Sequence, residues 1–204
     1  VFKVERCGIC GSDLHITEHP MALGQVLGHE YAGEVVEIGS AVKGLKIGDR
    51  VAAMPVTGCG ECSYCLAGEP SWCANRQLRG GGYGQFAVAS GHECVALPPD
   101  LSMDDGALVE PLSVGLHGVE LAELKPNAKV LIIGAGPIGL ATAFWSERLG
   151  AGKIAVTARS DRRAGLAMEM GATAFVPGTD RLDDAVQEAL GGRPDVVFEC
   201  VGAR

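Results

Sequence analysis

Apolar runs of strand length alternate with longer stretches of helical periodicity in the second half of the chain. The expected strands occupy residues 129–133, 153–158, 174–176 and 196–198. The helical stretches between them end at Leu149, Met170 and Leu190. Alternation of strands with helices is typical of βαβ units, which build a parallel sheet covered by helices. This half is therefore predicted to be a doubly wound α/β domain.

The first half has a different pattern, in which short apolar pieces are separated by glycine and polar turns. Its expected strands occupy residues 34–38, 50–54 and 85–89. A helix over 113–124, ended by Pro126, is expected to join this β-rich region to the second half. The change of period predicts two domains, 1–111 and 112–204.

Composition and charge narrow the possible functions. The 204 residues are 47% hydrophobic and 21% charged, which is ordinary for a globular protein. A formal net charge of −8 argues against a nucleic-acid surface, because such a surface needs a basic patch. No apolar run approaches the roughly 20 residues that span a bilayer. No secretory signal is visible either, so we expect a cytoplasmic protein with no membrane partner.

The densest candidate metal site is a segment with the spacing C-x2-C-x2-C-x7-C. Its cysteines are Cys59, Cys62, Cys65 and Cys73. This spacing is typical of a structural zinc ion held by four thiolates, with no open coordination position. An iron–sulfur cluster would favour a shorter last gap and a proline after the final cysteine. A disulfide framework would need an oxidising compartment, and coincidence is the remaining alternative. We predict a zinc ion that stabilises a loop.

A glycine motif opens the helix after the first expected strand of the second half. Gly134, Gly136 and Gly139 match the G-x-G-x-x-G pattern, and Pro137 and Ile138 lie within it. The first glycine permits a tight turn, the second lets the backbone approach a pyrophosphate, and the third permits close helix–strand packing. The helix N-terminus then faces the phosphates. An ordinary strand–helix turn is the alternative, but the strand–glycine–helix context favours dinucleotide binding.

The end of the next strand favours NADP(H) over NAD(H). An NAD site places an acidic residue about twenty residues after the glycine motif, against the ribose 2′-hydroxyl. Ala158 occupies that position here, and Arg159 and Arg163 follow it. A 2′-phosphate would meet no carboxylate, and a guanidinium can pair with it through two hydrogen bonds. Surface arginines, or Asp161 as a shifted acid, are the alternatives.

A second candidate metal site lies in the first half. Cys10, His29 and Glu30 offer a thiolate, an imidazole and a carboxylate, all of which zinc accepts. Each of these residues could also have a different role. Cys7 and Cys10 could be a redox pair, and His29 and Glu30 could be a polar pair in a loop. Glu110, which precedes the joining helix, could cap that helix.

Five motifs together resemble those of the zinc-dependent medium-chain alcohol dehydrogenases, particularly the polyol, butanediol and threonine dehydrogenase branch. In chain order they are CGICGSDLH, GHEYAG, the four-cysteine segment, VEPLSV and GAGPIG. The resemblance runs from end to end of the chain. It implies a GroES-like β-barrel catalytic domain followed by a Rossmann domain. It also implies further strands before Val1 and after Arg204, so we expect a piece of a longer protein with both domains partial.

The resemblance implies roles for individual residues. The ligands that it implies for a catalytic zinc ion are Cys10, His29, Glu30 and Glu110. Cys10 and His29 would bind the metal directly. Glu30 would be the third ligand or lie adjacent to it, and Glu110 would bind the metal directly or through a water. Ser12 matches the hydroxyl that accepts the substrate's proton, and His15 matches the histidine that completes the relay to solvent.

The implied reaction is hydride transfer between a nicotinamide cofactor and a secondary alcohol or polyol, or its ketone. Zinc would lower the pKa of the substrate hydroxyl, and this needs an open position that the four-thiolate site lacks. Two other functions stay open: a zinc-independent reductase of quinones or enones on the same scaffold, and a non-catalytic protein that binds through its zinc segment. The family also implies a homodimer or homotetramer.

Overall fold

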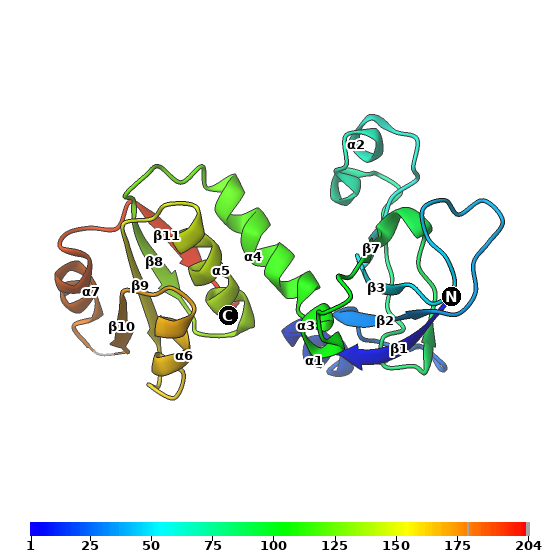
Figure 1. Ribbon diagram of the computed structural model, residues 1–204. Coiled ribbons are helices and arrows are strands. Elements are labelled where there is room, and N and C mark those ends of the chain that lie inside the picture. The colour runs from blue at the N-terminus through cyan, green and yellow to red at the C-terminus, as the bar shows by residue number, and fades with distance from the viewer. Residues whose placement is uncertain (179, 203–204) are drawn as a thin grey trace. The chain divides into compact units, whose positions relative to one another are not determined.

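The computed structural model describes residues 1–178 and 180–202, and the chain divides into two compact units, Val1–Glu110 and Pro111–Arg204 (Figure 1). The elements of the first unit are β1 (Phe2–Cys7), α1 (Gly11–Thr17), β2 (Tyr31–Val35), β3 (Arg50–Ala53), β4 (Val56–Thr57), α2 (Ser63–Leu66), η1 (Pro70–Trp72), β5 (Gln77–Leu78), β6 (Phe86–Ala87), η2 (Gly91–Glu93), β7 (Cys94–Ala96) and α3 (Met103–Ala107). The remaining elements are α4 (Val109–Leu121), β8 (Lys129–Ile133), α5 (Pro137–Arg148), β9 (Lys153–Ala158), α6 (Ala164–Glu169), β10 (Ala174–Pro177), α7 (Leu182–Leu190) and β11 (Val196–Glu199). Within the described residues, no helix combines the length and apolar character needed to cross a bilayer.

A five-stranded antiparallel sheet, in the order β6-β1-β2-β3-β7, forms the centre of the first unit. Successive side chains of a strand point to opposite faces, and β2 follows this rule. Tyr31 and Val35 pack with Phe2 on one face. Ala32 packs on the other face with Ala107 of α3. Both faces of this sheet are therefore apolar, as a β-rich domain with its own core requires.

The strand expected over 34–38 begins three residues earlier, at Tyr31, and ends at Val35. Its pairing with β1 explains the shift, because Phe2 lies opposite Val35 and the ladder ends there. A Cβ at Gly33 would lie 2.1 Å from the Lys3 carbonyl oxygen, so glycine allows the two strands to approach.

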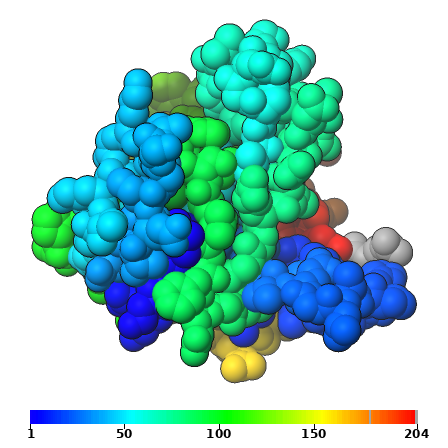
Figure 2. All heavy atoms as spheres, turned by 90° about the vertical axis from the view of Figure 1, so that its right-hand side faces the viewer, coloured from blue at the N-terminus to red at the C-terminus, as the bar shows by residue number. Residues whose placement is uncertain are grey.

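The connection between β4 and β5 stands out from the rest of the first unit as a lobe (Figure 2, cyan). This cysteine lobe, residues 58–76, contains only α2 and η1, and neither helix has a buried residue.

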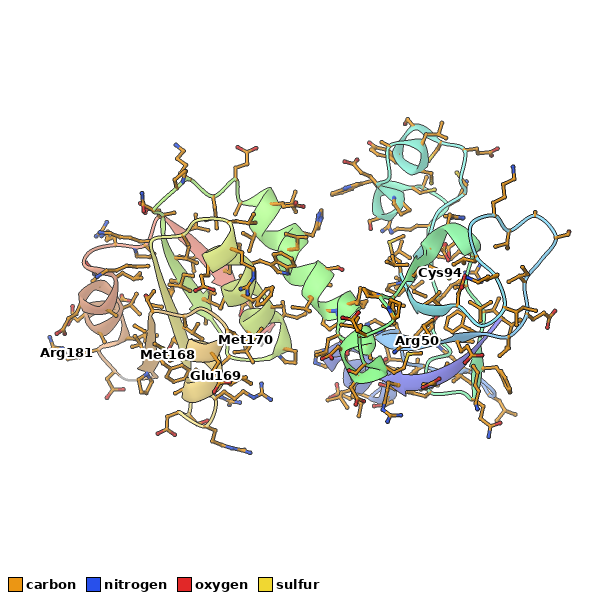
Figure 3. The ribbon with its side chains drawn as sticks, in the orientation of Figure 1. Arg50, Cys94, Met168, Glu169, Met170 and Arg181 are labelled. Atoms are coloured by element: carbon orange, nitrogen blue, oxygen red, sulfur yellow. The ribbon has the colours of Figure 1, made fainter. Side chains whose placement is uncertain are left out.

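On the main sheet, Arg50 of β3 (labelled in Figure 3) donates a hydrogen bond to the carbonyl of Pro99 at 2.9 Å and another to the carbonyl of Leu101. These bonds hold the segment that leads into α3.

The second unit is built on a four-stranded parallel sheet in the order β10-β9-β8-β11. Its strands β8 and β9 have the expected bounds. Leu140 of α5 and Ala167 of α6 pack against one face of the sheet, together with Ile132. Leu190 of α7 packs with Ala155 against the other face. The prediction of a doubly wound α/β domain beside a β-rich domain is confirmed.

The joining helix and the short helices of the first unit differ from the sequence prediction. The helix expected over 113–124 begins at Val109 and ends at Leu121, which places Glu110 in its first turn. It stops before Glu123, whose φ of 48° is incompatible with a helix. The short helix α1 was not predicted, because its only buried residue is Asp13 and it has no apolar stripe.

Candidate active site and metal centres

Cys10, His29 and Glu30 come together in the first unit. Their ligand atoms all lie within 4.8 Å of one another. The antiparallel pairing of β1 with β2 explains this, because Cys7 at the end of β1 lies opposite Tyr31 at the start of β2. The segment after Cys7 and the segment before Tyr31 therefore meet at the same end of the two strands. Glu30 is buried, and Cys10 and His29 are half-buried. We call these three residues the Cys10 cluster; it offers one sulfur, one nitrogen and one oxygen donor, a set suited to zinc.

Asp13 lies beside this cluster and accepts three hydrogen bonds. The donors are the backbone amide of Cys10 at 3.0 Å, the amide of Gly28 at 3.4 Å and the hydroxyl of Tyr83 at 2.8 Å. Its Oδ1 is 3.6 Å from Nδ1 of His29. Burial raises the pKa of Asp13, but these hydrogen bonds and His29 outweigh burial, and the net pKa lies below its usual value. Asp13 is therefore an anion placed to orient the imidazole of His29.

Glu110 adds a further, half-buried carboxyl group near the cluster. Burial raises its pKa above the usual value, His29 opposes this rise, and Glu30 and Asp13 reinforce it. It is not one of the three residues whose ligand atoms lie within 4.8 Å of one another. Three carboxyl groups and a thiol thus share this region with one histidine. A divalent cation would offset that accumulation of negative charge, so the residues present fit a zinc ion.

Ser12 and His15 lie on α1 and are both exposed. They are three residues apart, so their side chains project from the same side of the helix. The neighbouring Asp13 is the residue that α1 buries. The helix thus separates the carboxylate that faces His29 from the two side chains that face outward.

The four cysteines of the cysteine lobe also come together, with their sulfur atoms within 4.8 Å of one another. The Sγ–Sγ distance is 3.5 Å between Cys62 and Cys65 and 4.0 Å between Cys59 and Cys65. Zinc–sulfur bonds of about 2.3 Å in a tetrahedron require sulfurs about 3.8 Å apart, whereas a disulfide requires about 2.05 Å. The described cysteines are all free thiols. This spacing fits a tetrahedral zinc site with four protein ligands.

Backbone amides of the lobe donate hydrogen bonds to its sulfur atoms. The amides of Cys59 and Asn75 donate to Sγ of Cys73 at 3.4 and 3.3 Å. Backbone amides of Glu61 and Cys62 lower the pKa of Cys59 to about 7. The Gly60 amide lowers the pKa of Cys65, but burial and the neighbouring thiols raise it to about 11. Without a metal, four thiolates would repel one another, and a bound cation removes that penalty.

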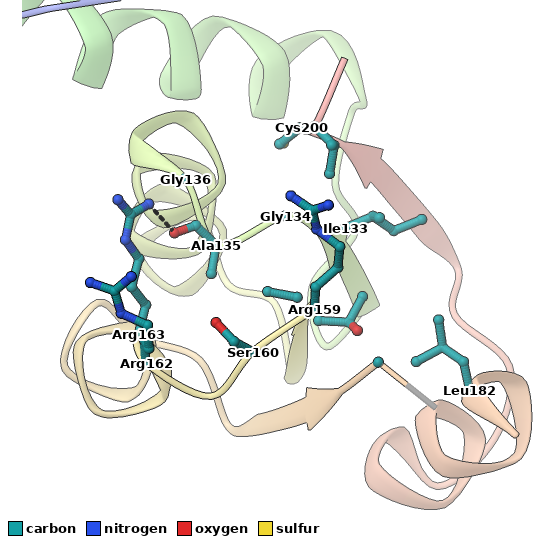
Figure 4. A pocket seen from close by; sticks show the side chains of 14 residues that line it. Ile133, Gly134, Ala135, Gly136, Arg159, Ser160, Arg162, Arg163, Leu182 and Cys200 are labelled. Carbon is teal, nitrogen blue, oxygen red and sulfur yellow. Dashed lines mark hydrogen bonds between the residues drawn. The ribbon is translucent and has the colours of Figure 1, made fainter. Parts of the chain in front are cut away.

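A pocket of about 720 Å³ in the second unit lies at the carboxyl ends of β8 and β9, beside the glycine motif (Figure 4). Gly134 and Gly136 line it, whereas Pro137, Ile138 and Gly139 do not. A Cβ at Gly139 would lie 1.8 Å from the Gly134 carbonyl oxygen, so this glycine allows the helix to pack closely. A Cβ at Gly136 would meet no atom within 4 Å. Gly136 therefore borders open space in front of the N-terminus of α5, which suits a bound phosphate.

Ala158 and three arginines also line the pocket. Arg159, Arg162 and Arg163 all line the pocket, and Arg163 donates to the Ala135 carbonyl at 2.8 Å (Figure 4). In this view Arg162 and Arg163 lie at one end of the pocket, and Arg159 lies near Gly134 and Cys200. Among the described residues, no aspartate or glutamate lines the pocket, so the alternative that Asp161 contributes a carboxylate to it gains no support.

Sequence reasoning assigned no role to Asp13, Tyr83 or Arg162. Asp13 had a local signal, because it lies three residues after Cys10, the spacing of a helix capping pair. Arg162 stood in the arginine-rich segment and was not selected. Tyr83 had no signal of this kind, since its contact with Asp13 joins residues 70 positions apart.

Comparisons with known proteins point to the same family as the sequence motifs. Residues 1–99 match the family model of the alcohol dehydrogenase GroES-like domain, and residues 137–204 match that of the zinc-binding dehydrogenases. A sorbitol dehydrogenase of Arabidopsis thaliana is 34% identical over 221 residues, which cover 98% of this chain and 60% of that protein. The chain thus spans about 60% of the length of this curated relative.

Two solved structures are also similar. Galactitol-1-phosphate dehydrogenase from Escherichia coli has a TM-score of 0.86 and 34% identity, and the match covers 98% of this chain and 60% of that one. A protein from Sinorhizobium meliloti, assigned as a zinc-binding dehydrogenase and solved with bound NADP, has a TM-score of 0.87 and 37% identity. That match covers 99% of this chain and 62% of the other.

Proposed function

Because the chain belongs to the zinc-dependent medium-chain alcohol dehydrogenase family, we propose that the full-length protein is an oxidoreductase of secondary alcohols or polyols and their ketones. It transfers a hydride between this substrate and a nicotinamide cofactor. The observation that carries the proposal is the Cys10 cluster, with its three different donor atoms within 4.8 Å of one another. A closed four-thiolate site alone would not support catalysis, because it leaves no position for a substrate.

Cys10, His29 and Glu30 would hold the catalytic zinc ion. Glu110 is the proposed further ligand, directly or through a water, because its half-buried carboxyl group lies within electrostatic range of His29. A zinc ion bound there supplies Lewis acidity that lowers the pKa of the substrate hydroxyl. Ser12 accepts the hydroxyl proton through a hydrogen bond, and His15 passes it to solvent. Both side chains project from one side of α1, the helix that begins directly after Cys10.

The pocket of the second unit is the proposed cofactor site. Gly134 and Gly136 border the space for the pyrophosphate, and Ala158 takes the place of an acidic residue. The arginines that line the pocket support a preference for NADP(H) over NAD(H), since guanidinium groups pair well with a 2′-phosphate. Arg163 also holds the glycine loop through the Ala135 carbonyl.

The proposal extends to the organisation of the full-length protein. We place the catalytic domain at 1–111 and the dinucleotide-binding domain at 112–204 of this sequence. We further propose a cytoplasmic homodimer or homotetramer that acts on small-molecule alcohols, without a nucleic-acid or membrane partner. The acidic composition, with a formal charge of −8, supports the absence of a nucleic-acid partner.

Metal content and turnover of the full-length protein test the proposed function. We expect about two zinc ions per chain, one for each ligand set. We also expect oxidation of at least one member of a panel of polyols and secondary alcohols, assayed with both cofactors. Reduction of activated double bonds that persists after chelation would indicate the quinone or enone reductase instead. Two zinc ions with no turnover on either panel would indicate a non-catalytic binding protein.

Replacement of Arg159 by alanine tests the cofactor preference. A hydrogen bond to a charged group contributes about 1.5–3 kcal/mol, so Arg159→Ala is expected to weaken NADPH binding by roughly tenfold to a hundredfold. NADH binding should change by less than about twofold, because NADH has no 2′-phosphate. The measurement is the dissociation constant of each cofactor. Arg193→Ala is the control, since Arg193 is exposed in the same unit and does not line the pocket. Equal weakening of both cofactors would refute the preference.

A further inference from the structure

Tyr83 lies where three segments of the proposed zinc centre meet. Its hydroxyl donates a hydrogen bond to Oδ2 of Asp13 at 2.8 Å and lies 3.3 Å from the carbonyl oxygen of Gly8. Burial and the Asp13 carboxylate both raise the pKa of Tyr83. The hydroxyl therefore keeps its proton and acts as a donor. Tyr83 thus links the loop that carries Cys10 to the carboxylate that faces His29.

The ring of Tyr83 makes a second contact, with the backbone that precedes His29. A Cβ at Gly28 would lie 2.7 Å from Cδ1 and 2.9 Å from Cε1 of Tyr83, so the ring packs directly on this glycine. Backbone hydrogen bonds also join the segment of Tyr83 to the segment that precedes His29. The amide of Tyr83 donates to the Leu27 carbonyl at 3.1 Å, and the amide of Gly82 donates to the Gly28 carbonyl at 2.9 Å. The tyrosine is therefore held in place independently of its hydroxyl.

We propose that Tyr83 is a positioning residue of the catalytic zinc site, which acts by fixing Asp13 so that Asp13 orients His29. This inference rests on the proposed function, because it assumes a metal ion at the Cys10 cluster. Carboxylates that pair with a metal-bound histidine fix its tautomer and ring orientation. Asp13 has this position, with Oδ1 3.6 Å from Nδ1 of His29.

The hydroxyl of Tyr83 has a role that the two backbone donors to Asp13 do not fulfil. Those donors, the amides of Cys10 and Gly28, both belong to the loops that carry the proposed ligands. Tyr83 comes from a third segment, which is also tied to β1, because the Val4 amide donates to the Gln85 carbonyl at 3.0 Å. Without the Tyr83 hydroxyl, Asp13 would accept hydrogen bonds only from the loops that carry the proposed metal ligands. Outer partners of metal ligands typically contribute 10- to 100-fold to metal affinity, so we expect an effect of about tenfold.

The experiment compares zinc affinity in Tyr83→Phe and in the unmodified full-length protein. Phenylalanine retains the ring that packs on Gly28 and removes only the hydroxyl. Zinc per chain is measured after equilibration with a series of zinc chelators of increasing strength. Cys10→Ser and Cys65→Ser variants, each of which removes one site, assign the two steps of the titration. The zinc ion of the cysteine lobe then serves as an internal reference in the same molecules.

The chain offers two matched controls among its three tyrosines. Tyr64→Phe removes a hydroxyl from α2 in the cysteine lobe, where the ring is 49% exposed. Tyr31→Phe removes a buried hydroxyl that, within the described part of the chain, has no hydrogen-bond partner. Neither change should alter the affinity of the Cys10 site by more than about twofold, since neither hydroxyl contacts Asp13.

The expected result is that Tyr83→Phe raises the zinc dissociation constant of the Cys10 site about tenfold and leaves the lobe site unchanged. Unchanged affinity at the Cys10 site, or equal losses at both sites, would overturn the inference. Failure of the proposed function looks different, because the unmodified protein would then bind no zinc at Cys10, His29 and Glu30.

Discussion

In the full-length protein, Cys10→Ser is expected to slow alcohol oxidation at least about a thousandfold and to lower the zinc content from two ions per chain to one. A serine hydroxyl stays protonated near neutral pH and is a poor zinc ligand in comparison with a thiolate. Loss of the metal removes several kcal/mol of stabilisation from the developing alkoxide, and every 1.36 kcal/mol corresponds to a tenfold change in rate. Steady-state kinetics and metal analysis of the same preparation measure both effects.

Cys94→Ser is the matched control for this substitution. Cys94 is a half-buried thiol at the start of β7, in the same unit, and it donates to the Ser90 carbonyl at 3.5 Å. Serine can retain that hydrogen bond, so zinc content and activity should stay within about twofold of the unmodified protein. Activity that survives Cys10→Ser with one zinc ion lost would contradict the proposed role of the Cys10 cluster. It would instead favour the zinc-independent reductase.

Cys65→Ser is expected to unfold the cysteine lobe locally while the rest of the protein stays folded. Apolar packing contributes little there, since Leu66 and Trp72 are 75% and 61% exposed. Cys73 is the one buried residue among the lobe's described side chains. A structural zinc ion stabilises small domains of this kind by about 10–16 kcal/mol in isolated peptides. Its loss should therefore bring the free energy of local opening close to zero.

Hydrogen exchange measures this opening. Amides of residues 59–75 are expected to exchange at least about a hundredfold faster in Cys65→Ser, whereas amides of β8 and β9 should be unaffected. The zinc content should again fall from two ions to one, but the remaining ion would now be at the Cys10 cluster. The Cys94→Ser protein is the reference here too. Unchanged exchange in the lobe, with both zinc ions retained, would show that the four thiolates do not hold a metal.

The two ligand sets differ in what surrounds them, and this difference separates their proposed roles. The lobe sulfurs are supported by backbone amides, such as the two that donate to Cys73. The Cys10 cluster is surrounded by carboxyl groups, including Asp13 and Glu110, whose pKa values respond to His29. Side chains that differ in donor type and acidity can adjust a metal's electronic properties, whereas four thiolates fill all coordination positions of a tetrahedral zinc ion.

The strands of the second unit could be predicted from sequence more accurately than those of the first. A parallel strand buried on both faces is a continuous apolar run, and β8 and β9 have the predicted bounds. Several strands of the first unit have only two or three residues, and β2 contains a glycine. At Gly33 the absence of a side chain is required by the approach of Lys3 on the neighbouring strand. That requirement depends on the pairing, which local sequence does not record.

The sequence by itself determined the donor sets of this protein: the four-cysteine spacing, the strand–glycine–helix motif and the order of motifs that identified the family. These signals are local, because ligand spacing and turn glycines are imposed by neighbouring residues. Only the tertiary structure decided that Asp13 faces His29, that Tyr83 holds Asp13, and that three arginines and, among the described residues, no carboxylate line the pocket beside the glycine motif. Hydrogen-bond partners far apart in sequence meet only through the path of the chain. Asp13 and Tyr83 are 70 positions apart, and the sequence between them carries no pattern that predicts their contact.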